Sequence, residues 1–262
     1  MTARTALIAG RGGLPAALVA EASDPLLVCV PEGIEPDGIV PAHVFRLERL
    51  APFLDHLAAL GIERVVMAGA MARPRLDPAL IDAATARLLP RLLGAMPAGD
   101  DALLRAVVAV IEETGLAVAG AADLAPGLVP GAGVLCGAPG DGDARDADRA
   151  AAIAAALGAV DVGQGCVVDR GLCLGVEALP GTDAMLDFVA ATRTGRGGLL
   201  WKAPKPGQDL RVDMPALGPA TVARAAAAGL AGIAWQGGRV LCLDRAGMVA
   251  AAMRAGLFLW AR

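Results

Sequence analysis

The first half of the chain alternates short apolar runs with longer helical stretches, and this order restricts the folds open to it. The apolar runs at Thr5–Ala9, 26–30 and 64–67 lie close to glycine or proline, which predicts buried strands. Helices are predicted over 14–22, 50–60, 78–96 and 99–114. Pro90 is expected to divide the third helix into two pieces, because proline lacks the backbone N–H. A β-α-β-α-β order predicts a parallel sheet with right-handed crossovers.

The second half mixes hairpin and helix signals. It follows residues 129–145, where Gly, Pro and Asp gather as in a linker. Arg170-Gly171 predicts a tight hairpin, and Gly237-Gly238 predicts a second one. The predicted helices are 146–157, 181–192, 221–228 and 244–255, and the predicted strands are 165–169, 172–178, 199–203, 230–235, 239–243 and 257–260. We therefore expect a domain at 1–128, the linker, and a mixed α+β domain at 146–262.

Composition narrows the class of protein. With 56% hydrophobic and 19% charged residues, the 262-residue chain can bury a large core and is not disordered. Only 3% of residues are aromatic and the net charge is −4, which argues against a nucleic-acid-binding surface. Five cysteines without a C-x-x-C pair indicate free thiols in a reducing cytoplasm. No apolar run is long enough for a signal peptide or a membrane span, so the chain is expected to be cytosolic.

Residues 202–218 form a polar, proline-rich segment inside this apolar sequence. Lys202 and Lys205 supply point charges and Arg211 a bidentate fork, all suited to phosphate oxygens. Asp213, like Asp209, supplies hard oxygens for a divalent cation or a base for water. Prolines make the segment rigid, which favours a binding loop over an ordinary solvated loop.

A glycine loop follows the first predicted strand and opens the first helix. Its backbone N–H groups and the helix N-terminus could hold a phosphate or nucleotide, although a purely structural turn explains it equally well. The loop is neither a complete G-x-G-x-x-G fingerprint nor a P-loop. Its candidate binding residues are Gly10, Gly12, Gly13, Leu14 and Pro15.

Acidic and amide side chains occur in three further blocks. Asp101 follows Gly99, where it could cap a helix or help to hold a cation. Glu177 ends an apolar strand and needs a partner if it is buried. The remaining candidate binding residues in these blocks are Gln164, Thr182 and Asp183. Phosphate-binding cations, a glycine loop and clustered carboxylates together suggest metal-assisted phosphoryl chemistry in a cleft between two α/β domains.

These blocks resemble the LpxI-type UDP-2,3-diacylglucosamine pyrophosphatases of bacterial lipid A synthesis. The resemblance covers nearly the whole chain. It rests on IAGRGGLP at 8–15, Ala68-Gly69 with Arg73-Pro74, GDDALLR at 99–105, DVGQG at 161–165, VEA at 176–178 with GTDAML at 181–186, and the run 202–221. Arg11 stands where the family commonly has a small residue, and the glycine- and aspartate-rich stretch 131–145 departs from its pattern.

The resemblance implies a Rossmann-like N-terminal domain, a C-terminal catalytic domain and an active site in the interdomain cleft. It implies hydrolysis of UDP-2,3-diacylglucosamine to 2,3-diacylglucosamine 1-phosphate (lipid X) and UMP, by water attacking the α-phosphate with Mg²⁺ present; Mn²⁺ is the alternative ion. The essential Asp of the family's R-x-D-x-P block falls on Asp213. We expect Lys202, Gln208 and Arg211 to assist it, Lys205 and Thr221 to bind substrate, and Asp213, Asp101 and Glu177 to hold the metal.

The residues alone are also compatible with two other functions. One is a non-catalytic protein that binds a nucleotide-sugar or lipid carrier. The other is a Rossmann oxidoreductase, with Glu32 about 20 residues after the glycine loop. For the leading hypothesis the partner is a lipid-linked UDP-sugar, met by transient peripheral contact at the inner face of the inner membrane. A homodimer is an open alternative to a monomer.

Overall fold

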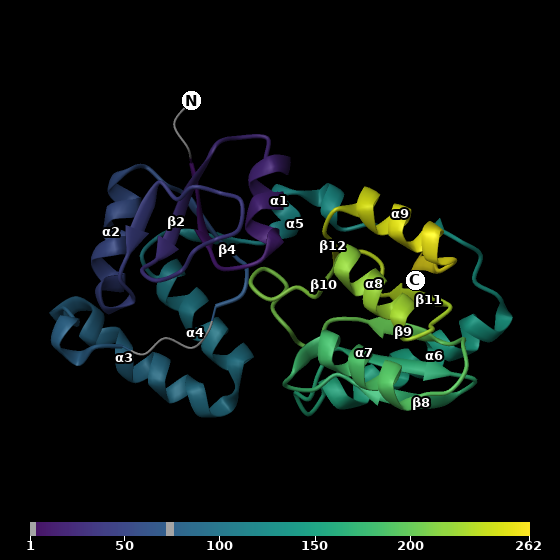
Figure 1. The fold of residues 1–262 in the computed structure, drawn as a ribbon. Coiled ribbons are helices and arrows are strands. Elements are labelled where there is room, and N and C mark those ends of the chain that lie inside the picture. The colour runs from purple at the N-terminus through teal and green to yellow at the C-terminus, as the bar shows by residue number, and fades with distance from the viewer. Residues whose placement is uncertain (1–3, 72–75) are drawn as a thin grey trace. The chain divides into compact units, whose positions relative to one another are not determined.

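A computed structural model describes residues 4–71 and 76–262 of the chain (Figure 1). The chain divides into two compact units. The first unit holds Met1–Pro126 together with a short later segment, Asp209–Asp213, and the second holds Gly127–Gln208 and Met214–Arg262. The two-domain α/β fold class is thereby confirmed. Arg73-Pro74, one of the blocks that carried the resemblance, lies outside the described residues.

The first unit contains a five-stranded parallel sheet with the strand order β3-β2-β1-β4-β5. Its strands are β1 (Thr5–Ala9), β2 (Leu26–Pro31), β3 (His43–Phe45), β4 (Arg64–Ala68) and β5 (Ala117–Ala119). This is the Rossmann-like order, in which the chain reverses direction across the sheet between β1 and β4. Ligands of such sheets bind beyond the carboxyl ends of the strands at that reversal, so the loops after β1 and β4 are the first place to look for a site.

Helices cover both faces of this sheet (Figure 1). They are α1 (Gly13–Glu21), α2 (Leu50–Ala59), α3 (Ala83–Ala95), α4 (Asp100–Glu112) and α5 (Ala121–Leu124), with short 3₁₀ turns η1 (Leu47–Arg49), η2 (Pro78–Leu80) and η3 (Met96–Ala98). Residues of α2 and α4 such as Leu54 and Ile111 pack with Ile8, Val65 and Val118 in one buried core. Alternate strand residues therefore face this core, as a period of two requires.

The first half differs from the predicted pattern at three places. Strands β3 and β5 were not predicted, because each has only three residues and neither stands out as an apolar run. Pro90 does not divide its helix: α3 runs continuously from Ala83 to Ala95 with Pro90 inside it. A proline removes one helical hydrogen bond, and its neighbours along α3 still pack against α4 and η3.

The second unit contains a six-stranded mixed sheet with the order β6-β13-β11-β9-β7-β8. Its strands are β6 (Gly133–Cys136), β7 (Gly165–Asp169), β8 (Leu172–Val176), β9 (Leu199–Lys202), β11 (Gly232–Trp235) and β13 (Phe258–Ala261). The central strands β9, β11 and β13 are parallel, whereas β7 and β6 run antiparallel to their neighbours. The β7–β8 hairpin confirms the turn predicted at Arg170-Gly171.

Two helical layers enclose the six-stranded sheet. Val167, Leu200 and Ile233 face α7 (Gly181–Thr192), α8 (Pro219–Ala227) and α9 (Arg245–Ala255). Residues one position along each strand, such as Cys166 and Trp201, face the alanine-rich helix α6 (Asp141–Gly158). A further 3₁₀ turn, η4 (Pro126–Leu128), lies where the two units divide.

The second half differs from the predicted pattern at two places. The segment expected to be a linker, 129–145, contains strand β6 and the first residues of α6. The hairpin expected around Gly237-Gly238 is wrong: β12 (Leu241–Cys242) pairs in parallel with β10 (Ala216–Leu217) in a separate two-stranded sheet. Both edges of β11 are already paired with β9 and β13, so β11 cannot accept β12.

Within the described part of the chain, no helix is both long and apolar enough to cross a membrane.

The five cysteines are free, and their burial predicts their reactivity. Cys173 is exposed, while burial raises the pKa of Cys29 to about 11 and the pKa of Cys166 and Cys242 to about 12. The thiolate is the reactive form, so we expect Ellman's reagent at pH 8 to modify Cys173 rapidly, half-buried Cys136 slowly, and the other three only in denaturant. Cys173→Ser should remove the rapid phase; a rapid phase larger than one thiol would contradict the burial.

Candidate active site

Three strands of the parallel sheet in the first unit end in the same dipeptide, alanine followed by glycine. Gly10, Gly69 and Gly120 follow β1, β4 and β5 directly. A Cβ on Gly10 would lie 2.6 Å from the carbonyl oxygen of Ala70, and a Cβ on Gly69 would lie 2.8 Å from that of Arg11. The backbones therefore touch at the carboxyl edge of the sheet, which no larger residue would permit.

The predicted phosphate loop after β1 is closely tied to the rest of the first unit. The amides of Gly10 and Arg11 donate to the carbonyl oxygens of Ala68 and Ala70, at 2.8 and 2.9 Å. The amide of Gly12, at the N-cap of α1, donates to the Asp37 carboxylate at 3.1 Å. Three of the N–H groups expected to cradle a phosphate already have acceptors in the protein. A nucleotide at this loop would meet the amides further along, at the start of α1.

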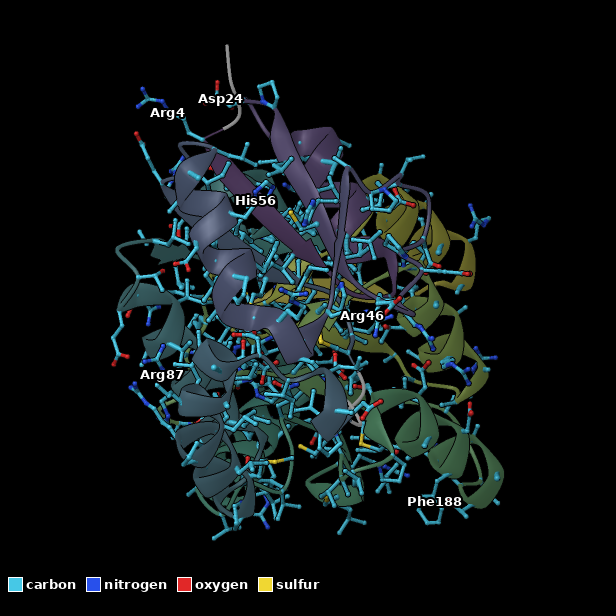
Figure 2. The ribbon with its side chains drawn as sticks, turned by 90° about the vertical axis from the view of Figure 1, so that its left-hand side faces the viewer. Arg4, Asp24, Arg46, His56, Arg87 and Phe188 are labelled. Carbon is cyan, nitrogen blue, oxygen red and sulfur yellow. The ribbon has the colours of Figure 1, made fainter. Side chains whose placement is uncertain are left out.

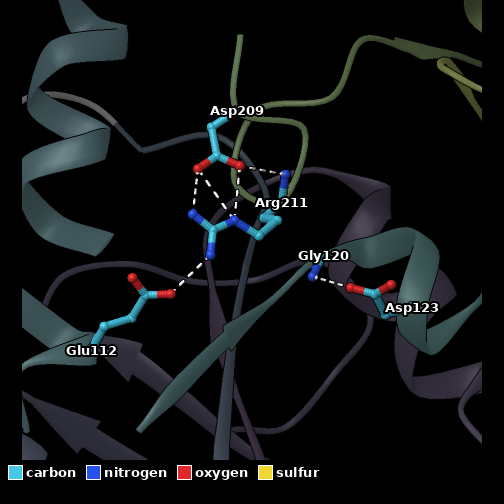
Figure 3. Close-up of polar contacts among 5 residues, drawn as sticks. All are labelled: Glu112, Gly120, Asp123, Asp209 and Arg211. Atoms are coloured by element: carbon cyan, nitrogen blue, oxygen red, sulfur yellow. Dashed lines mark hydrogen bonds and ion pairs between the residues drawn. The ribbon is translucent and has the colours of Figure 1, made fainter. Parts of the chain in front are cut away.

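The segment Asp209–Asp213, which carries the R-x-D block, lies at the same edge of this sheet (Figure 3). The Cα of Arg211 is 3.1 Å from where a Cβ on Gly120 would stand, so the glycine after β5 makes room for the segment. Val212 packs against the core of the first unit. The amide of Asp213 donates to the carbonyl oxygen of Asp209 at 3.1 Å, closing a turn. The segment is thereby held beside the end of β5, at the carboxyl edge of the sheet. Rossmann-like sheets bind their ligands beyond this edge.

The Arg211 guanidinium holds this segment in place by donating hydrogen bonds to two carboxylates (Figure 3). Its Nε and Nη2 donate to the two carboxylate oxygens of Asp209, at 3.0 and 2.7 Å, and its Nη1 donates to Glu112 Oε1 at 2.8 Å. The hydrogen bond from Arg211 holds the pKa of Asp209 below its usual range, and the same contact raises the pKa of Arg211. Both groups therefore stay charged at neutral pH, and the fork of Arg211 is occupied by protein carboxylates.

A second polar cluster lies in the second unit, at the carboxyl end of β9. The Nζ of Lys202 donates to Glu177 Oε2 at 2.7 Å and to Thr182 Oγ1 at 2.6 Å. The hydroxyl of Thr182 donates to the same Glu177 oxygen at 3.0 Å. Lys202 is 3% exposed and Glu177 is 7% exposed, so this is a buried ion pair. A Cβ on Gly165, the partner of Lys202 on β7, would lie 2.7 Å from Glu177 Oε2, so glycine leaves the space that the carboxylate fills.

The loop after β9 continues these contacts within the second unit. Lys205 forms an ion pair with Asp161, and its backbone amide donates to Gln208 Oε1 at 2.7 Å. Gln208 is buried. Gln164 Oε1 is also buried, and no hydrogen-bond partner for it occurs among the described residues. An unpartnered buried carbonyl group is a candidate acceptor for a bound water or ligand.

The predicted site residues thus fall into two groups. The β1–α1 loop, Asp101, Arg211 and Asp213 belong to the first unit. The second unit holds Gln164, Glu177, Thr182, Asp183, Lys202, Lys205, Gln208 and Thr221. Asp183 pairs with Arg224 on the exposed surface of the second unit, and Asp101 pairs with Arg105 along α4.

The residues that position the candidates were not predicted from the sequence. Glu112 lies at the end of an amphipathic helix, where an acid carries no signal of its own. Gly120 was overlooked although it shares the alanine-glycine pattern of Gly10 and Gly69, and this repeated pattern could have identified it. Lys202, Lys205 and Arg211 were expected to be available to phosphate, but each is paired with a carboxylate.

The predicted metal ligands do not form one carboxylate cage. Among the described residues, no three His, Cys, Asp or Glu side chains form a group that could hold a metal ion. Glu177 Oε2 is taken by Lys202 and Thr182, which makes Glu177 a poor ligand. Mg²⁺ bound with a nucleotide commonly takes only one or two carboxylates, with phosphate oxygens and water completing its shell. Asp213 and Asp101 both belong to the first unit, and Asp101 is paired with Arg105.

The contact between the loops after β1 and β4 predicts a contrast between two nearby glycines. Gly10→Ala should destabilise the first unit by about 1–3 kcal/mol, because its methyl group would collide with backbone atoms. Gly13→Ala has nothing within 4 Å of the added Cβ and should change stability by less than about 1 kcal/mol. Urea unfolding followed by circular dichroism measures both. Equal effects of the two variants would contradict the close approach.

The ion pair in the Asp209–Asp213 segment predicts a pH-dependent contribution to stability. The folded-state pKa of Asp209 is lowered, so its contribution is present above the ordinary aspartate pKa of about 3.9 and is lost as pH falls through the lower folded value. Because Arg211 is 42% exposed, we expect Asp209→Asn to lower the free energy of unfolding by only about 1 kcal/mol at pH 7. The difference from the wild type should shrink in acid, and should vanish in an Arg211→Met background.

Comparison with known proteins agrees with the resemblance seen in the sequence. The family model of the LpxI N-terminal domain matches residues 4–128, and that of the LpxI C-terminal domain matches residues 131–260. The UDP-2,3-diacylglucosamine pyrophosphatase LpxI of Caulobacter vibrioides is 43% identical over 211 residues, which cover 78% of this chain and 75% of that protein. With both domains matched along almost its entire length, this chain belongs to the LpxI family.

Proposed function

We propose that this chain is a pyrophosphatase that hydrolyses UDP-2,3-diacylglucosamine to 2,3-diacylglucosamine 1-phosphate and UMP. The similar protein from Caulobacter vibrioides carries the name of this activity. The observation that carries the proposal here is the placement of Asp213, because its segment is packed on the carboxyl edge of the Rossmann-like sheet in the first unit. A nucleotide at that edge would bring its diphosphate close to this carboxylate.

The reaction replaces one phosphorus–oxygen bond by another. In the proposed direction, the oxygen of water bonds to the α-phosphorus, and the bond from that phosphorus to the bridging oxygen breaks. The bridging oxygen leaves with the acylated sugar phosphate, and UMP keeps the oxygen from water. The Asp213 carboxylate accepts a hydrogen bond from this water and orients it for in-line attack.

A divalent cation suits this chemistry. We propose Mg²⁺, with Mn²⁺ as the alternative, and Asp213 and Asp101 as the residues that would hold it beside the diphosphate oxygens. When bound, such an ion neutralises charge on those oxygens and lowers the pKa of a bound water. Glu177 is left out of this set because its carboxylate is buried against Lys202, whereas Arg105, the partner of Asp101, is exposed.

Because each cationic side chain of the segment 202–218 is paired with a carboxylate, we propose that it contributes N–H donors in fixed directions more than net positive charge. Arg211 fixes the segment that carries Asp213, and Gln208 accepts from the backbone of Lys205 and shapes the preceding turn. Lys202 keeps a donor for the substrate. Substrate contacts are further proposed for Gly13, Leu14, Pro15, Gln164, Thr182, Asp183, Lys205 and Thr221. We propose brief peripheral contact with the inner face of the inner membrane, from which the acyl chains of the substrate would be drawn.

Asp213→Asn tests the assigned role. We expect kcat to fall on the order of 100-fold or more, because the amide cannot act as a base and is a weaker ligand for a cation. The measurement is UMP release from UDP-2,3-diacylglucosamine at saturating Mg²⁺. Asp24→Asn is the matched control, since Asp24 is exposed at the surface of the first unit (Figure 2). Full turnover by Asp213→Asn would remove Asp213 from the mechanism.

Hydrolysis in water enriched in ¹⁸O tests the direction of attack. Label found in UMP supports attack at the α-phosphorus, whereas label found in the sugar phosphate would place the attack at the β-phosphorus and overturn that part of the proposal.

The alternative function, binding of a nucleotide-sugar or lipid carrier without chemistry, makes a different prediction. It requires tight binding of the UDP-sugar with no product at any Mg²⁺ concentration. The oxidoreductase alternative has lost its motivation, because the chain belongs to the LpxI family and Glu32 pairs with Arg46.

A further inference from the structure

Lys202 is more deeply buried than any other charged side chain among the described residues. It ends β9, one of three parallel strands, so its side chain begins at the carboxyl edge of the mixed sheet. Burial of an ammonium group is unfavourable unless it is paired and hydrogen-bonded. Glu177 and Thr182 provide that pairing. An apolar residue would fill this buried position at a lower desolvation cost. The presence of lysine there therefore indicates a role beyond packing.

The composition of the chain makes this lysine unusual. Of 23 basic residues, only Lys202 and Lys205 are lysine, and the other 21 are arginine. The chain does use arginine for a buried ion pair elsewhere in the second unit, between Arg193 and Asp169. A Cβ on the neighbouring Gly165 would lie 2.7 Å from Glu177 Oε2, so the carboxylate that pairs with Lys202 is held close to the β7 backbone. Lysine presents a compact ammonium to this carboxylate, whereas arginine would present a planar fork.

The contacts of the Lys202 ammonium leave one of its N–H donors for a further acceptor. Lys202 has three N–H donors in a tetrahedral array. Two donate to Glu177 Oε2 and Thr182 Oγ1, which fixes the direction of the third. Within residues 4–71 and 76–262, these two side chains are the acceptors found for Nζ. The pair of Lys202 and Glu177 carries no net charge, so it offers an oriented donor and not a diffuse attractive field.

We propose that Glu177 and Thr182 are positioning residues for Lys202, holding its third N–H toward an anionic oxygen of the substrate. Glu177 then acts through Lys202 and is not a metal ligand. This inference rests on the proposed function, since the anionic oxygen is one of the diphosphate oxygens or their products. Thr182 lies in the first turn of α7 and orients both partners, because it accepts from Lys202 and donates to Glu177.

Kinetic coupling tests whether Glu177 acts through Lys202. Glu177→Gln and Lys202→Met should each lower kcat, by up to about 100-fold if the donor is misplaced by an ångström. In the double variant, Glu177→Gln should cause no further loss beyond Lys202→Met alone. Losses that multiply would show that Glu177 acts independently and would overturn the proposal.

A second variant covers the case in which Glu177→Gln fails to fold around an unpaired ammonium. Thr182→Val keeps the charge balance of the cluster and removes only one acceptor. We expect kcat to fall in Thr182→Val with little change in KM, and Thr182→Ser, which restores the hydroxyl, to recover most of the loss. Thr192→Val, at the exposed far end of the same helix, is the matched control. Unchanged kcat in a folded Thr182→Val would contradict the positioning role.

The dependence on Mg²⁺ separates this role from metal binding. If Glu177 positions Lys202, the Mg²⁺ concentration for half-maximal rate in Glu177→Gln stays within about twofold of the wild type, because no ligand is lost. A rise of tenfold or more in that concentration would identify Glu177 as a metal ligand and overturn the proposal.

Lysine-specific NMR separates failure of this inference from failure of the proposed function. With ¹³C-labelled lysine the chain gives only two sets of ε-methylene signals, and Lys205→Arg identifies them. Glu177→Gln and Thr182→Val should shift the Lys202 signal and leave the Lys205 signal in place, and UMP added to the wild type should shift the Lys202 signal. A Lys202 signal unmoved by the variants and by UMP would overturn the inference. A shifted signal without any hydrolysis of UDP-2,3-diacylglucosamine would leave the inference standing and reject the proposed function.

Discussion

The fork of Arg211 is the interaction on which the candidate active site depends. It binds Asp209 within its own segment and Glu112 at the end of α4, and so fastens five residues from late in the sequence onto the first unit (Figure 3). The chain leaves the second unit at Gln208 and returns to it at Met214. Residues of the N-terminal half therefore hold the segment that carries Asp213. Glu112, the open space at Gly120 and the packing of Val212 against the core together fix the segment at the sheet edge.

Glycine at the strand ends is the second constraint. In a parallel sheet, the loops beyond the carboxyl ends converge, and side chains there would normally keep the backbones apart. In the first unit, Gly10, Gly69 and Gly120 remove that separation, so the loops after β1 and β4 touch and the Arg211 backbone rests against the end of β5. The result is an edge formed largely by main chain. Such an edge can approach a nucleotide closely, which is the use that Rossmann-like folds make of glycine.

Charge in the segment 202–218 is arranged in pairs. Each of Lys202, Lys205 and Arg211 contacts a carboxylate, so the charge of each of these cations is neutralised locally. Paired cations attract a distant anion weakly, but they present donors in fixed directions once the anion is near. This fits the proposed pyrophosphatase, which would bind a diphosphate in one orientation although the chain's overall charge is −4.

The sequence by itself determined the elements whose signal is local. Apolar runs close to glycine or proline predicted β1, β2 and β4, the Arg170-Gly171 turn predicted the β7–β8 hairpin, and the motif blocks identified the family. It also singled out Asp213, through the R-x-D-x-P block. The tertiary structure decided strand partners and charge partners. β12 pairs with β10 because both edges of β11 are filled, and Lys202 and Arg211 meet acids 25 and 99 residues away in the chain. Those contacts form between residues that only folding brings together, so no local pattern of residues can specify them.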